Sequence, residues 1–140
     1  MAAAGIPQMK TVDIALKELR QRVKGLNSIT VTDRDGAMIL QEPKSDEGIV
    51  SQRAAIMSTV FSMTTDHTEK IGCFGKVKTI MSTNTNNISL QANQGPLVIR
   101  LTAAKDANVA AMMELLPQIQ KVLKTAEDVI SNETEQNEED

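Results

Sequence analysis

The stretch IVSQRAAIMSTVFSMTTD, residues 49–66, decides how this 140-residue chain folds and which surface it exposes. Its apolar residues recur at the spacing of an α-helix. They form two stripes along that helix. The first stripe is Ile49, Ile56, Val60 and Met63, and the second is Val50, Ala54, Met57 and Phe61. At 100° per residue, the centres of the two stripes lie about 120° apart.

Two stripes are more than a helix needs to cover one sheet, because a surface helix of a globular protein has one apolar stripe about 100° wide. The second stripe therefore needs another cover. In a domain this small we expect that cover to be a second protein chain, and a second helix of the same chain is the alternative. We assign Val50, Ala54, Met57 and Phe61 to the partner. The reverse assignment of the two stripes stays open.

The region before this helix predicts a helix and a hairpin. A single apolar stripe predicts a helix over residues 9–26, with Gly25 at its C-terminal cap. Residues 29–33 and 37–40 alternate as strands do. Asp35 and Gly36 stand between them, and this pair is typical of a tight primed turn.

The region after the helix predicts three strands and a long helix. Strands are expected at residues 77–83, 88–92 and 97–102, and the short turns between them indicate an antiparallel meander. The last helix begins near Asp106, a candidate N-cap. Pro117 interrupts it, but the apolar stripe continues in phase beyond the proline. We therefore expect one kinked helix and not two helices.

The order of these elements indicates an α/β protein of the α+β type, with one antiparallel sheet and helices on both of its faces. The strand at 77–83 follows the middle helix and is expected at an edge of the sheet. The unpaired backbone of an edge strand is a template for pairing with another chain. Thr79 and Met81 on this strand complete the candidate partner-binding residues.

Charge divides the chain unevenly. The net charge is -3, yet the seven acidic residues from Glu127 onward have no basic residue among them. We divide the chain into an N-terminal extension (1–8), one domain (9–130) and an acidic tail (131–140). A polar, acidic segment of this kind buries too little apolar surface to fold, so we expect the tail to be disordered.

The composition argues against several classes of function. Cys73 and His67 are the only cysteine and the only histidine, so no cluster has the spacing of a zinc site. We assign no catalytic, metal or cofactor residue and expect a protein that is not an enzyme; an enzyme or small-ligand domain is the alternative. Phe61 and Phe74 are the only aromatic residues, which argues against nucleic-acid binding by stacking. No stretch approaches the roughly 20 apolar residues of a membrane span, and we expect a cytosolic protein.

Several short motifs occur in an order that is typical of one known family. They are ITVTDRDG at 29–36, STVFSMTTD at 58–66, KIG at 70–72, PLV at 96–98 and ELLP at 114–117. From about residue 10 to 129, the sequence resembles the mitogen-activated-protein-kinase scaffold subunits of the Ragulator complex. These subunits, also called MEK-binding partners, belong to the roadblock superfamily. The sequence departs from the family at 80–83, where the family often has aromatic residues.

The resemblance implies a fold and a role. It implies a five-stranded antiparallel sheet with one helix on one face and the two terminal helices on the other. It also implies a heterodimer with a roadblock-type sister subunit, in which the middle helices pack together and the edge strands join. Other Ragulator subunits, Rag GTPases acting in TOR signalling, and the kinases MEK and ERK are the further partners implied.

The resemblance places such a protein in the cytoplasm, peripheral on the cytosolic face of late endosomes and lysosomes, where a lipidated partner holds the complex. No residue of this sequence can be assigned to kinase binding. A roadblock-type homodimer, such as a dynein light chain or a small-GTPase regulator, remains the alternative, because the same helix could pack against itself in a two-fold pair.

Overall fold

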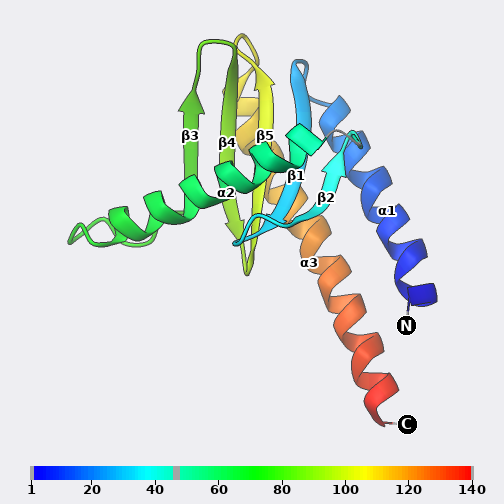
Figure 1. Cartoon of the computed structure of the whole chain (residues 1–140). Coiled ribbons are helices and arrows are strands. Elements are labelled where there is room, and N and C mark those ends of the chain that lie inside the picture. The colour runs from blue at the N-terminus through cyan, green and yellow to red at the C-terminus, as the bar shows by residue number, and fades with distance from the viewer. Residues whose placement is uncertain (1, 46–47, 140) are drawn as a thin grey trace.

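A computed structural model describes residues 2–45 and 48–139, and it describes side-chain packing for residues 10–45 and 48–127. The order of helices and strands is the one expected from the sequence (Figure 1). The elements are α1 (Ala2–Gln21), β1 (Leu26–Asp33), β2 (Met38–Glu42), α2 (Gly48–Glu69), β3 (Thr79–Thr83), β4 (Asn87–Gln94), β5 (Leu97–Ala104) and α3 (Val109–Glu139).

The five strands form one sheet in the order β2-β1-β5-β4-β3. All neighbouring strands are antiparallel, and Leu101 of β5 stands opposite both Ile29 of β1 and Leu90 of β4. This confirms the expected antiparallel sheet. It also confirms that β3 lies at an edge.

The main core lies between the sheet and the two terminal helices. Side chains of α1, α3 and one face of the sheet pack into a single cluster, in which Leu16, Ile29, Leu101, Met112 and Ile119 are fully buried. Burying one such side chain contributes roughly 1.5–3 kcal/mol. This packing confirms that both terminal helices cover the same face of the sheet.

The opposite face of the sheet carries α2 alone (Figure 1). Most of the buried residues on this face are polar: Thr30, Thr32, Ser89 and Gln91, beside Val98. Gln91 and Arg100 stand opposite each other on this face, next to the Leu90–Leu101 pair that points to the main core. The side-chain amide of Gln91 donates a hydrogen bond of 3.0 Å to the main-chain carbonyl of Met57 in α2. A polar sheet face therefore holds α2 partly by hydrogen bonds.

The turn between β1 and β2 differs from the expected primed turn. Gly36 has a φ of +95°, and Asp35 is not among the residues with positive φ. The amide of Gly36 donates to the carbonyl of Asp33 (3.2 Å), and the amide of Asp33 donates to the carbonyl of Ala37 (3.0 Å). The hairpin therefore has a three-residue loop in place of the two-residue primed turn. It is a type I turn followed by a glycine in the left-handed conformation. The Asp33 carboxylate favours it by accepting a hydrogen bond of 2.9 Å from the amide of Ala37.

Two helix boundaries were predicted wrongly. Helix α1 ends at Gln21, and Leu26 already belongs to β1, where it pairs with Ala103. Leu26 is 4% exposed in β1. An apolar residue fits a helix stripe and a buried strand position equally well, so the apolar pattern did not distinguish the two. Helix α3 begins at Val109, and its cap is Asn108 and not Asp106. The Asn108 side-chain oxygen accepts a hydrogen bond of 3.1 Å from the amide of Ala111.

The two ends of the chain are helical in the structure. Helix α1 begins at Ala2, within the expected extension, and α3 continues to Glu139, through the segment expected to be disordered. A helix that is already nucleated adds one hydrogen bond for each residue it fixes, and glutamate is a good helix former. No glycine or proline follows Pro117 to stop it. Pro117 itself lies inside one continuous helix, which confirms one helix in place of two. The expected kink stays a prediction.

Candidate partner-binding surface

Helix α2 exposes a row of large apolar side chains. Ile49, Ile56, Val60 and Met63 are 50%, 62%, 47% and 56% exposed. They recur at helical spacing, so they form one continuous surface, which we call the apolar stripe. Isolated exposed apolar residues are ordinary, but a contiguous row of them marks an interaction site.

The other side of α2 is packed against the chain itself. Its buried residues are Ala54, Ser58, Phe61 and Thr65. Ser58 donates a hydrogen bond of 2.9 Å from its hydroxyl to the main-chain carbonyl of Asp33. Small residues on this side let the helix backbone come close to the β1–β2 hairpin, where Gly36 lies against Ala55. Phe61 on the same side is 2% exposed.

The assignment of the two stripes is therefore corrected. Ala54 and Phe61 are 3% and 2% exposed, so they are not available to a partner. Val50 and Met57 are half-buried beside the sheet. Apolar character alone had predicted all four at the partner interface. The hydroxyl of Ser58 distinguishes the two sides, because it finds its acceptor only when this side faces the hairpin.

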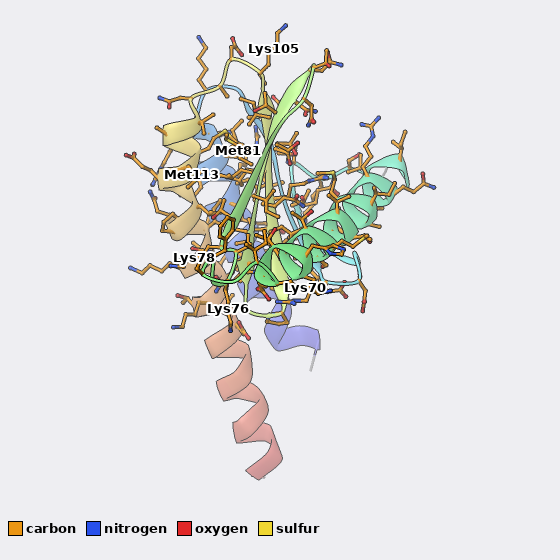
Figure 2. All side chains as sticks on the ribbon, turned by 90° about the vertical axis from the view of Figure 1, so that its left-hand side faces the viewer. Lys70, Lys76, Lys78, Met81, Lys105 and Met113 are labelled. Atoms are coloured by element: carbon orange, nitrogen blue, oxygen red, sulfur yellow. The ribbon has the colours of Figure 1, made fainter. Side chains whose placement is uncertain are left out.

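Strand β3 follows α2 in the chain and forms one edge of the sheet. Thr79 and Met81 stand opposite Ala92 and Leu90, so both point to the face covered by α1 and α3. Met81 is exposed and Thr79 is half-buried. Figure 2 looks onto this edge and shows Met81 together with Met113 of α3, a second exposed apolar residue. The role of Thr79 and Met81 in partner binding stays a prediction.

The connection between α2 and β3 is basic and partly apolar. Residues 70–78, KIGCFGKVK, carry Lys70, Lys76 and Lys78 and no acidic residue. Phe74 is 65% exposed and Ile71 is also exposed. We call residues 70–78 the basic loop; in Figure 1 it extends beyond β3, away from the rest of the sheet. The sequence shows the three lysines of the basic loop. Only the structure shows that they lie beside an edge of the sheet.

A groove lies between the first half of α2 and the polar face of the sheet. Its volume is about 610 Å³. Arg53 of α2 and Arg100 of β5 both line it, and none of its described lining residues is acidic. We call it the basic groove. It is also lined by Asn84 and Asn86, from the turn that follows β3, and by Asn87, the first residue of β4.

Polar groups in the basic groove lack partners. The Nε of Arg100 and the hydroxyl of Ser89 are buried and have no hydrogen-bond partner within the described part of the chain. Burial lowers the pKa of the Arg100 guanidinium below its ordinary value, and the positive charge of Arg53 lowers it further. An arginine does not lose its proton in a protein, so the groove keeps two positive charges without a described counter-charge.

The described residues offer little for catalysis or metal binding. Among them, no group of three His, Cys, Asp or Glu side chains could hold a metal ion. The described lining of the basic groove contains no His, Cys or carboxylate that could act as a nucleophile or a general base. In the described ranges, no helix has the length and apolar character required to cross a membrane.

Comparison with known protein sequences identifies relatives along most of the chain. The family model described as "Mitogen-activated protein kinase kinase 1 interacting" matches residues 10–131. The Ragulator complex protein LAMTOR3 of Danio rerio is 34% identical over 109 residues, which are 75% of this chain and 86% of that protein. The LAMTOR3 of Pagrus major is 32% identical over 110 residues, covering 79% and 87%. The LAMTOR3 homolog of Drosophila melanogaster is 28% identical over 116 residues, covering 83% and 92%.

Comparison with solved structures identifies the fold. The Roadblock/LC7 domain from Streptomyces avermitilis has a TM-score of 0.73 at 18% identity, covering 81% of this chain and 94% of that domain. MglB of Myxococcus xanthus has a TM-score of 0.71 at 9% identity, covering 85% and 96%. The sheet and helices described above are thus a Roadblock/LC7 fold, and the chain belongs to the mitogen-activated protein kinase kinase 1 interacting family, which includes the LAMTOR3 subunits of Ragulator.

Proposed function

We propose that this chain is a scaffold subunit without enzymatic activity that pairs with a roadblock-type sister subunit in a Ragulator-like complex. In this role it supports Rag GTPase-dependent TOR signalling and acts as a scaffold for the kinases MEK and ERK. The protein works in the cytoplasm, on the cytosolic face of late endosomes and lysosomes. It reaches the membrane through a lipidated subunit of the complex. Membership of the family and the names of its relatives support this proposal.

The observation that carries the proposal is the apolar stripe. Four large apolar side chains of α2 are about half exposed or more while the opposite side of the same helix is buried. Covering such side chains contributes roughly 0.8 kcal/mol for each buried CH₂ group. A second helix of similar character, laid along the stripe, would remove all four from water together.

The edge strand β3 supports the same mode of pairing. It follows α2 in the chain and forms one of the two edges of the sheet, with β2 at the other. A partner whose helix covers the apolar stripe can add its own strand to this edge. Main-chain hydrogen bonds then stabilise the pair, while the side chains of α2 give specificity.

The experiment that tests the proposal compares two substitutions of the same residue type. Ile56 of α2 and Ile14 of α1 are 62% and 59% exposed, on opposite sides of the sheet. Each is changed to aspartate, and the chain is co-expressed with a roadblock-type sister subunit. Complex formation is measured by size-exclusion chromatography with light scattering. We expect Ile56→Asp to abolish the one-to-one complex and Ile14→Asp to leave it intact.

The same pair of variants tests the proposed location in cells. If a lipidated subunit supplies the membrane contact, Ile56→Asp should be diffuse in the cytosol and Ile14→Asp should remain on late endosomes and lysosomes. A complex that forms equally well with both variants would contradict the proposal. A chain that forms a stable homodimer on its own would favour the homodimeric roadblock proteins instead.

A further inference from the structure

We propose that the basic groove binds an acidic segment of the sister subunit, the segment that precedes that subunit's own edge strand, and that the basic loop of this chain opposes pairing with itself. The inference rests on the proposed function, because it uses the pairing through α2 and β3. It adds the chemistry of the partner and a reason why the chain prefers a different partner to a second copy.

The first step is geometric. For two α2 helices to contact each other, both must lie on the same face of the joined sheet. The two-fold axis that relates the two subunits is then perpendicular to the sheet. The two edge strands therefore run antiparallel to each other. The beginning of the partner's edge strand therefore lies next to Thr83, the end of β3. The segment that leads into the partner's strand comes to lie over Asn84, Asn86 and Asn87, which line the basic groove.

The second step is electrostatic. Arg53 and Arg100 face the groove without a described acidic neighbour, and the Nε of Arg100 and the hydroxyl of Ser89 are buried without partners within the described ranges. When a partner covers the groove, these groups lose water as well. A buried charge without a partner is strongly unfavourable. A carboxylate is the matching ligand, because the planar guanidinium donates two parallel hydrogen bonds to its oxygens.

The third step concerns a second copy of this chain. In that pair, the segment over the groove would be the basic loop, which carries Lys70, Lys76 and Lys78 and no carboxylate. Three lysines would then be placed near two arginines. Like charges set against each other suppress a wrong partner, and this is a recognised route to specificity.

The experiment needs only this chain. Lys70, Lys76 and Lys78 are changed together to glutamate, and self-association is measured by sedimentation equilibrium at about 50 mM salt, where screening is weak. We expect the dimer of this loop variant to be at least about tenfold tighter than that of the unmodified chain, because repulsion becomes attraction. Adding Arg53→Glu to the loop variant should reverse the gain. Raising the salt to about 1 M should strongly weaken the self-association of the loop variant.

The matched control reverses three exposed lysines on the α1 and α3 side. Lys17, Lys24 and Lys124 are exposed and lie outside the groove and the basic loop. Their change to glutamate alters the net charge by the same amount, and it should not tighten self-association. If the loop variant associates no more tightly than this control, or if Arg53→Glu leaves its dimer unchanged, the inference is wrong.

A second arm separates this inference from the proposed function. The sister subunit is titrated into Arg53→Glu, Arg100→Gln and Ile56→Asp. Arg53 is exposed, so its change leaves the core intact even if Arg100→Gln disturbs the sheet. Weaker binding of Arg53→Glu, most evident at low salt, supports the inference. If Ile56→Asp abolishes pairing while Arg53→Glu binds like the unmodified chain, the scaffold function stands and the acidic-segment inference falls.

Discussion

Gly36 lies against Ala55, and a Cβ atom added to Gly36 would stand 2.6 Å from the Cα of Ala55. This close approach brings the turn of the β1–β2 hairpin into contact with the backbone of α2. Together with the hydrogen bond from Ser58 to the carbonyl of Asp33, it fixes which side of α2 faces the chain. The direction in which the apolar stripe points follows from this contact.

Gly36→Ala should therefore lower the free energy of unfolding by about 2–4 kcal/mol. The left-handed φ of +95° alone disfavours a side chain by roughly 1–2 kcal/mol, and the clash with the backbone of Ala55 adds to it. Urea denaturation measures the loss. Gly75→Ala is the control, because Gly75 also has a positive φ (+74°) but open space around its Cβ position. Equal losses in the two variants would show that the contact with Ala55 does not matter.

Phe61→Asp and Val60→Asp should separate folding from pairing at neighbouring positions. Phe61 is 2% exposed and Val60 is 47% exposed. We expect Phe61→Asp to lower the free energy of unfolding by at least about 3–5 kcal/mol, because it removes core volume and buries a charge. Val60→Asp should leave the free energy of unfolding nearly unchanged and should abolish binding of the sister subunit. Circular dichroism on thermal unfolding reads the first effect, and light scattering of the co-expressed pair reads the second.

The ion pair between Arg20 and Glu42 should stabilise the contact between α1 and β2. Its Nε and Oε1 atoms are 3.2 Å apart, and both side chains are mostly buried. Arg20→Met leaves the Glu42 carboxylate buried without this partner, and we expect a loss of about 1–3 kcal/mol. Adding Glu42→Leu should recover much of that loss, as judged by urea denaturation.

A second ion pair serves as the control for that prediction. Lys44 and Asp13 are 3.0 Å apart, but Lys44 is 75% exposed. Lys44→Met should change the free energy of unfolding by less than about 1 kcal/mol. A larger loss from Lys44→Met than from Arg20→Met would show that burial does not decide how much these two ion pairs contribute.

Asn108→Ala should destabilise α3, whereas Asp106→Ala should not. The side chain of Asn108 accepts a hydrogen bond from the amide of Ala111, which has no partner within the helix. Losing an N-cap of this type lowers stability by about 1 kcal/mol. Thermal unfolding of the two variants compares them directly. If Asp106→Ala is the more harmful change, the cap assigned from the sequence is the correct one.

The order and type of the elements could be predicted from local patterns in the chain. Periods of 3.6 and 2 residues are local properties, so they were readable for α2, for the meander from β3 to β5 and for the α3 stripe that continues through Pro117. The edge position of β3 and the antiparallel sheet also followed from local order. The motifs at residues 29–36 and 114–117 indicated the family, and the relatives confirm it.

Local patterns could not show which stripe of α2 is exposed. That depends on the contact between Ser58 and Asp33, which are far apart in the sequence and meet only after folding. The basic groove has the same origin: its charged and unpartnered groups come from α2, β4 and β5. The end of α1 also depends on a distant residue. Leu26 belongs to β1 and not to the helix because it pairs with Ala103 of β5. Apolar patterns report that a side chain is buried, but only the packed chain shows what buries it.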